Sequence, residues 1–189
     1  MKNIYLIVAP SGAGKTTVTE LLESKYGLKP IQSYTTRLPR FESETGHTFV
    51  SDEEFDKLTD TVAYTEFAGN RYCAVAKQVE ENDLYVIDPK GVAFFKEHYN
   101  GSKQVKIIYI ESDMTTRYER MKQRSEDSGS TYLEAVDHSL KRIVNDVSEF
   151  YDYIHHRVQV DCIVENNSDT TIENVADKIY KFITETEVG

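Results

Sequence analysis

The chain has 189 residues, 39% of them hydrophobic and 29% charged, a balance typical of one globular domain with a sizeable core. Its formal net charge of −10 argues against partners that bind through bulk positive charge, such as nucleic acid or an anionic membrane. Two cysteines distant in the sequence, Cys73 and Cys162, match no metal-ligand spacing and indicate a reduced, cytoplasmic compartment.

The first predicted element is a buried strand at residues 4–9. This apolar run is too short to span a membrane, and a glycine-rich segment follows it at once, so it indicates a strand and not a signal peptide. A helix is predicted from residue 15 to about residue 25, where Gly27 ends it. Strand, glycine-rich turn and helix in this order are typical of a phosphate-binding loop.

The turn between that strand and helix carries the residues that such a loop needs. Small residues let backbone N–H groups approach phosphate oxygens, and the helix N-terminus faces the same anion. Lys15 is expected to reach the β- and γ-phosphates, and the Thr16 hydroxyl to hold Mg²⁺. Ala9 replaces the first glycine of the pattern, which is compatible with a negative φ. The alternative is an ordinary strand–turn–helix with an unrelated lysine. The predicted ATP-binding residues of this segment are Ser11, Gly12, Ala13, Gly14, Lys15, Thr16 and Thr17.

A second candidate phosphate site follows a predicted strand at residues 30–33. Arg37 and Arg40 are three residues apart on a stretch stiffened by Pro39. Two guanidinium groups can hold a phosphate dianion from two sides. The alternative is a solvated basic loop.

The region between residues 34 and 74 indicates a small α+β insert. Ser51 and Glu54 have the spacing of a capping box that opens a helix. Strands are predicted at residues 62–67 and 71–75, joined by the turn Ala68-Gly69-Asn70.

The remaining elements alternate between strands and helices, which favours an α/β fold with a parallel sheet. Strands are predicted at residues 84–88, 105–111 and 162–164, and a last helix at about 171–184. A segment rich in Ser, Asp, Glu and Gly at residues 123–132 is predicted to be a mobile loop between two helices.

Charged side chains of this second half suggest further site residues. Arg117, Arg120 and Arg124 have helical spacing and share one face, which is unfavourable unless an anion lies opposite. The alternative is a solvated face paired with nearby glutamates, an interpretation that applies best to Arg117. Asp88 ends an apolar strand at the sheet edge where α/β proteins bind ligands, unless it only caps the helix after Pro89.

These motifs together resemble the guanylate kinase family over most of the chain. The resemblance rests on the phosphate-binding loop followed by Thr-Thr-Arg-x-Pro-Arg, and on later landmarks in the family's order. Those landmarks are Gly46; Phe49-Val50-Ser51; Phe67-x-Gly69-Asn70-x-Tyr72; Val86-Ile87-Asp88 with Gly91; an arginine-bearing helix; and Asn166.

The resemblance implies a P-loop NTPase-type three-layer αβα fold. Its core domain would comprise residues 1–33 and 75–189, with a lid within about 120–142 and an inserted acceptor-monophosphate domain at 34–74. Ser33, Arg37, Arg40 and Tyr72 would meet the acceptor phosphate, and Asp88 would face the acceptor and the metal. Arg120, Arg124 and Arg142 would clamp the transferring phosphate, and Asn166 would lie near adenine.

The activity so implied is phosphoryl transfer from ATP, with Mg²⁺, to a nucleoside monophosphate, most simply GMP or dGMP, by a monomer or homodimer. Its partners would be small-molecule substrates, without nucleic acid or membrane. One alternative is a kinase of the same family with another (deoxy)nucleotide or a sugar phosphate as acceptor. Another is a non-catalytic binding module, although such modules typically lose the lysine that stands here as Lys15.

The sequence departs from the family where the guanine base is read. An acid and a hydroxyl residue are expected at the positions of Ala63 and Ala74, and a methyl group cannot accept from guanine N–H groups. Glu66 could compensate only in a different strand register, because a shift of three residues reverses the face. The segment from Gly46 is two residues short and lacks the family's tyrosine, for which His47 could substitute.

Overall fold

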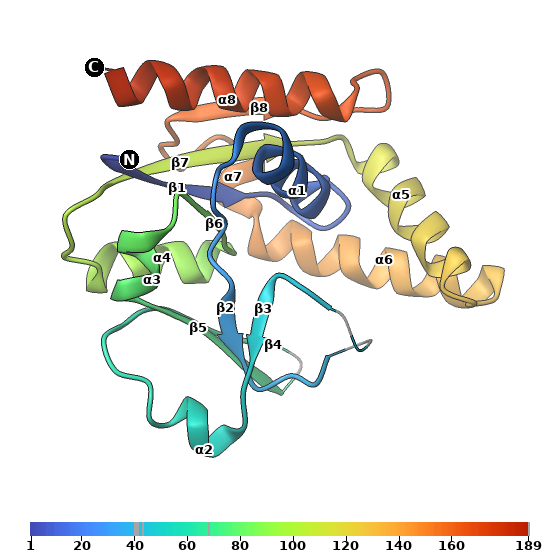
Figure 1. Ribbon diagram of the computed structural model, residues 1–189. Helices are drawn as coiled ribbons and strands as arrows, with labels where there is room; N and C mark the ends of the chain where they lie inside the picture. The colour runs from blue at the N-terminus through green and yellow to red at the C-terminus, as the bar shows by residue number, and fades with distance from the viewer. Residues whose placement is uncertain (40–41, 43, 68, 189) are drawn as a thin grey trace. The chain divides into compact units, whose positions relative to one another are not determined.

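The computed structural model describes residues 1–39, 42, 44–67 and 69–188, and the chain forms two compact units (Figure 1). The first contains Met1–Leu6 and Gly27–Lys106, and the second Ile7–Tyr26 and Ile107–Gly189. The predicted boundaries of an insert at 34–74 and a lid within 120–142 remain predictions.

The principal sheet has the strand order β6-β1-β7-β8. All six residues of β1 are buried, as are Ile107–Ile110 of β7, and such continuous apolar strands are typical of sheets covered on both faces. Strands β7 and β8 are parallel, and the strand order requires crossover connections, so the predicted α/β fold with a parallel sheet is confirmed. The four strands are β1 (Asn3–Val8), β6 (Leu84–Val86), β7 (Gln104–Glu111) and β8 (Cys162–Glu165).

The first unit also contains a smaller sheet with the order β3-β2-β5-β4. Its strands are β2 (Ser33–Thr35), β3 (His47–Phe49), β4 (Thr61–Phe67) and β5 (Asn70–Val75). β2 is parallel to β3 and antiparallel to β5, which is antiparallel to β4. The helices of this unit are α2 (Asp52–Phe55), α3 (Ala76–Glu81) and α4 (Pro89–His98), and α4 packs against β4.

Local sequence signals in this unit have mixed outcomes. The predicted capping box is confirmed, because the Glu54 N–H donates to the Ser51 side chain and the Ser51 N–H donates to the Glu54 carboxylate. The predicted strand at 30–33 is wrong in its bounds: Pro30 forms only an isolated bridge to Leu84, and the strand begins at Ser33. Proline lacks the N–H that a continued ladder needs. Ala68 of the predicted turn lies outside the described residues.

The second unit carries the glycine-rich loop and five helices among its described residues. Helix α8 packs against α1 and β8, and α5 packs against α6, as Figure 1 shows. The buried face of α8 contains Val175, Ala176 and Ile179, as its apolar spacing predicts. The helices are α1 (Lys15–Tyr26), α5 (Met114–Asp127), α6 (Tyr132–Glu149), α7 (Tyr151–Ile154) and α8 (Ile172–Val188).

The predicted mobile loop at 123–132 is wrong for its first half, which is helical. Gln123 donates to Asp127 one turn later, at 2.8 Å, and this pair supports the last turn of α5. Gly129 has a φ of 93°, and Thr131 then opens α6 with a capping box, so the connection is only four residues long. No helix in the described part of the chain is long and apolar enough to cross a membrane.

Candidate active site

The glycine-rich loop between β1 and α1 depends on glycine at two positions. Gly12 and Gly14 have φ values of 77° and 91°, which L side chains rarely adopt. A Cβ atom at Gly12 would lie 2.6 Å from the Arg117 carbonyl oxygen, and one at Gly14 would lie 2.5 Å from Asn166 Nδ2. Ala9 is buried and has no positive φ, so alanine is compatible with the first position of the loop.

Lys15, the first residue of α1, lies against the loop. Its ammonium group donates to the carbonyl oxygens of Ala9 and Pro10, the latter at 3.2 Å. The pKa of Lys15 is lowered from 10.5 to about 8, chiefly by burial; Asp146 opposes this effect, and the positive charges of Arg142 and Arg117 add to it. A bound phosphate would reverse this balance, because an anion favours the charged lysine.

A cavity of about 370 Å³ joins the loop to three arginines that are distant from it in the sequence. Arg142 donates to Ser11 Oγ at 2.9 Å, and Arg120 donates to the Asn166 carbonyl oxygen at 3.0 Å. Such a concentration of positive charge at a helix N-terminus favours an anion. The lining residues are Pro10, Ser11, Gly12, Gly14, Lys15, Thr16, Thr17, Arg120, Met121, Arg124 and Arg142.

Arg117 neither lines the cavity with Arg120 and Arg124, as the shared helix face predicted, nor is it solvated, as the alternative interpretation held. Its side chain is 3% exposed and pairs with Asp146, whose side chain is 7% exposed, at 2.5 Å. Arg117 Nε also donates to the Ser11 carbonyl oxygen at 2.9 Å, and Asp146 accepts from the Ser11 backbone N–H at 2.8 Å. This Arg117–Asp146 pair therefore holds the loop in place.

Sequence reasoning missed Asp146 altogether. Its only signal is its position one turn after Arg142 on α6, on the same inward face as the buried Ser139 and Ile143.

Asn166 directly follows β8 and is 1% exposed. Its amide donates to the Ala13 carbonyl oxygen at 2.9 Å, so Asn166 also supports the loop from behind. An adjoining cavity of about 210 Å³ is lined by Gly14, Thr17, Arg120, Asn166, Thr170 and Ile172. Its position beside the loop suits the remainder of a nucleotide whose phosphates lie over Lys15.

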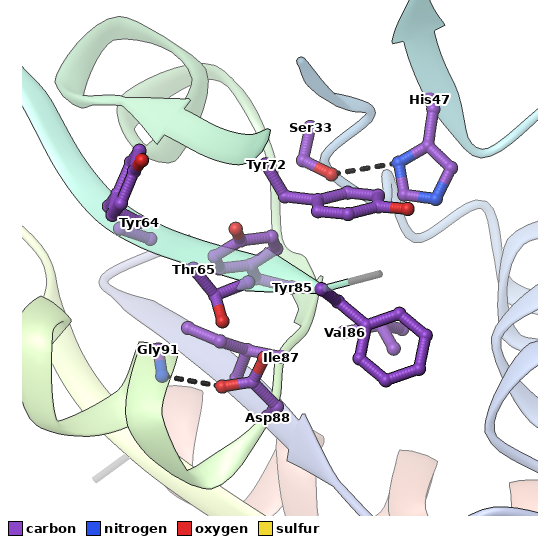
Figure 2. Close-up of a pocket in the computed structure, with 12 residues that line it drawn as sticks. Ser33, His47, Tyr64, Thr65, Tyr72, Tyr85, Val86, Ile87, Asp88 and Gly91 are labelled. Atoms are coloured by element: carbon purple, nitrogen blue, oxygen red, sulfur yellow. Dashed lines mark hydrogen bonds between the residues drawn. The ribbon is translucent and has the colours of Figure 1, made fainter. Parts of the chain in front are cut away.

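The first unit contains a separate cavity of about 210 Å³ on the small sheet (Figure 2). Ser33 Oγ and His47 Nδ1 are 3.0 Å apart, and the His47 ring lies edge-on to Tyr72 with 5.6 Å between centroids. His47 thus lies beside two of the predicted acceptor-binding residues. The lining residues are Ser33, His47, Ala63, Tyr64, Thr65, Phe67, Tyr72, Tyr85, Val86, Ile87, Asp88 and Gly91.

Arg37 does not line this cavity in the structure. Its guanidinium forms a two-pronged ion pair with Glu44, with N–O distances of 2.7 and 3.0 Å. This carboxylate raises the pKa of Arg37, and the Tyr72 phenol contributes in the same direction. Arg37 therefore lies close to Tyr72, which lines the cavity, but its guanidinium group is engaged by Glu44. Arg40, the other predicted arginine, lies outside the described residues.

Asp88 is at the junction of β6 and α4. Its Oδ1 accepts from the Gly91 N–H at 2.6 Å and caps α4, as the alternative interpretation of this residue predicted. Asp88 also lines the cavity, as Figure 2 shows, so capping does not remove it from the candidate acceptor site. Its assignment as a metal ligand stays a prediction.

Comparison with known proteins assigns the chain to a family. Residues 1–182 match the family model described as guanylate kinase. The chain belongs to the guanylate kinase family. It is 34% identical to the guanylate kinase of Geobacter metallireducens, over 80% of this chain and 78% of that protein. The guanylate kinase of Geobacter sulfurreducens is 33% identical with the same coverage.

The fold agrees with this family assignment. The crystal structure of guanylate kinase from Anaplasma phagocytophilum matches with a TM-score of 0.60 and covers 99% of this chain and 87% of that one. The two sequences are 22% identical, so this likeness supports the fold alone.

The wall of the cavity differs from the guanylate kinase pattern that reads the base. Ala63 and Ala74 are directly opposite on β4 and β5; Ala63 lines the cavity, whereas Ala74 is buried and does not. Glu66 is exposed and accepts from the Tyr64 hydroxyl, so it does not replace the missing acid in the cavity. Thr65, two residues after Ala63, lines the cavity and presents a hydroxyl.

Proposed function

We propose that this protein is an ATP-dependent kinase that transfers the γ-phosphoryl group to a nucleoside monophosphate, with GMP or dGMP as the first candidates. The observation that carries the proposal is the cavity in which the phosphate-binding loop and three arginines meet, in a chain of the guanylate kinase family. Phosphoryl transfer needs no covalent intermediate, because positioning and charge neutralisation supply most of the catalysis.

In the donor site, Lys15 and the N–H groups of the loop bind the β- and γ-phosphates of ATP. Arg120, Arg124 and Arg142 neutralise charge on the transferring group, and the cavity beside Asn166 receives the base and sugar. When bound with ATP, Mg²⁺ neutralises phosphate charge.

The residues present fit such a cation. Thr16 offers an exposed hydroxyl at the start of α1, beside the loop that would hold the phosphates. Mg²⁺ in nucleotide sites is held by one or two protein ligands together with phosphates and water, so a single hydroxyl is sufficient there.

In the acceptor site, Arg37, Arg40, Ser33 and Tyr72 bind the monophosphate, with His47 beside them. Asp88 faces the nucleoside. The Arg37–Glu44 pair must open for this, because a guanidinium that is engaged in a two-pronged pair cannot bind a phosphate in the same way. We further propose a cytoplasmic protein, in keeping with the free thiols of Cys73 and Cys162, acting as a monomer or homodimer.

The test is ATP turnover with a panel of acceptors under one condition: GMP, dGMP, IMP, AMP, dAMP and a pyrimidine monophosphate. GMP or dGMP should be phosphorylated, and Ala63 in the cavity wall favours at least one other purine nucleotide within about a hundredfold in kcat/KM. Failure with every nucleotide, while ATP still binds, would contradict the proposal and favour a sugar-phosphate acceptor or a binding module.

A further inference from the structure

The Tyr85 hydroxyl is a polar group in the acceptor cavity with no structural role of its own. Tyr85, on β6, is 5% exposed and lines the cavity, and no hydrogen-bond partner for its hydroxyl is found among the described residues. Two other tyrosines of this unit are engaged: Tyr64 donates to Glu66, and Tyr99 donates to Glu80. A hydroxyl that has no protein partner and opens onto a cavity is free to bind a ligand, and it loses that hydrogen bond if the ligand lacks a matching group.

The Tyr85 oxygen is open to the cavity. In the described part of the chain, the fully enclosed side-chain oxygens without a partner belong to Ser112 and Ser139, both in the other unit. The Tyr85 oxygen is not one of them, so it keeps access to the space that its ring lines. Figure 2 shows the Tyr85 side chain amid the labelled residues of the cavity, near Thr65 and Tyr72.

The surroundings keep this phenol protonated. Burial raises the pKa of Tyr85, and the nearby Cys73 and Asp88 raise it further. A neutral phenol donates one hydrogen bond, and it donates well to a carbonyl oxygen.

The cavity offers few other groups to a base. Asp88 is the only acidic residue among its described lining residues, and one of its oxygens caps α4. Ala63 contributes a methyl group, and the Thr65 hydroxyl can donate or accept. A carbonyl on the base therefore finds a donor in Tyr85, whereas an exocyclic amino group meets the Ala63 methyl group on β4, and the one carboxylate among the described lining residues, Asp88, is partly engaged in capping α4.

We propose that Tyr85 is the specificity-determining residue of the acceptor site and donates to the 6-oxo group of a purine nucleoside monophosphate, whose 2-amino group is not read. The inference rests on the proposed kinase function and deepens it. Its substrate class is the 6-oxopurine monophosphates. GMP and IMP both carry the 6-oxo group and differ only in the 2-amino group, so their kcat/KM values should differ by less than about tenfold.

The experiment compares wild type with Tyr85→Phe on GMP, IMP and purine riboside 5′-monophosphate, which lacks both the oxo and the amino group. The variant should raise KM for GMP and IMP roughly fivefold to tenfold, the effect of one neutral hydrogen bond, with little change in kcat. It should leave purine riboside monophosphate unchanged, because the contact is already absent there.

The matched control is Tyr34→Phe. Tyr34 is on β2 next to Ser33 but alternates to the opposite face and does not line the cavity, so all three acceptors should behave as with wild type. Tyr85→Phe removes an oxygen without a partner, so its melting temperature should equal or exceed that of wild type.

Equal losses on all three acceptors, or no loss on any, would overturn the inference. A preference for GMP over IMP above about tenfold in kcat/KM would overturn the claim that the 2-amino group is unread. If wild type phosphorylates no nucleotide, the proposed function fails, and calorimetric binding of GMP and IMP to both proteins still decides the inference. Weaker GMP binding by Tyr85→Phe supports it, and unchanged or absent binding overturns it.

Discussion

Asp146→Ala tests whether the Arg117–Asp146 pair holds the phosphate-binding loop. The substitution leaves the Arg117 guanidinium, 3% exposed, without its carboxylate. It also removes the acceptor of the Ser11 backbone N–H at 2.8 Å and of the Ser11 hydroxyl at 3.2 Å. The loss therefore affects both the stability of the second unit and the position of the loop.

The magnitude follows from the burial of the pair. Removing one partner of a buried ion pair costs about 3–5 kcal/mol, because the remaining charge stays desolvated. In a chain of this size, each kcal/mol lowers the melting temperature by about 2–4 °C, so a decrease of about 6–20 °C is expected. ATP binding should weaken as well, because Ser11 loses an anchor in the donor cavity.

The assay is thermal unfolding followed by circular dichroism, together with ATP titration below the transition. Asp137→Ala is the matched control: it removes a carboxylate of the same helix whose ion pair with Lys141 is exposed on both sides, so its effect should be below about 1 kcal/mol. A double variant, Arg117→Met with Asp146→Leu, should recover most of the stability. If Asp146→Ala unfolds at the same temperature as Asp137→Ala, the reasoning is refuted.

Three further predictions concern the substrate sites. Lys15→Ala should retain less than about a tenth of wild-type turnover with an unchanged fold, because it removes a charge worth a few kcal/mol to the transferring phosphate; near-normal steady-state rates would contradict this. The ATP affinity of the free protein should fall as pH rises through about 8, because the protonated Lys15 binds phosphate and its pKa lies there; a flat profile of Kd between pH 7 and 9.5 would contradict this. Arg37→Ala should weaken acceptor binding by about 1.5–3 kcal/mol without affecting ATP, measured as separate KM values; a loss confined to ATP would show that Arg37 belongs elsewhere.

The elements with strong local signals could be predicted from the sequence. The buried strand before the loop, the helix from Lys15, the Ser51 capping box and the β4–β5 hairpin all follow from spacing and turn residues within a few positions. The loop at 123–132 could not be predicted, because its composition suggests disorder although Gln123 and Asp127 support one more helical turn.

The residues that act through tertiary contacts could not be predicted from the sequence, for a different reason. Only the folded chain creates the ion pairs of Asp146 and Glu44 and the cavity that Tyr85 lines. In the sequence, the residue types alone do not distinguish these three positions from surface positions. Arg117 shares its helix face with Arg120, yet one is enclosed behind the loop and the other lines the cavity. Periodicity gives the face of a helix, but not which of its residues another segment will cover.

The contacts behind the glycine-rich loop also determine when this protein becomes able to bind nucleotide during its synthesis. The loop is complete within the first 16 residues, but the groups that brace it are separated from it by 106 positions at Arg117, 135 at Asp146 and 153 at Asn166. Contacts of such sequence separation form late, after the intervening chain is available. A ribosome-bound chain that ends before Asn166 therefore carries the loop's sequence without its braced conformation. Nucleotide binding is therefore acquired only after Asn166 has been synthesised and has packed behind the loop, and only then can ATP stabilise the folded state by mass action.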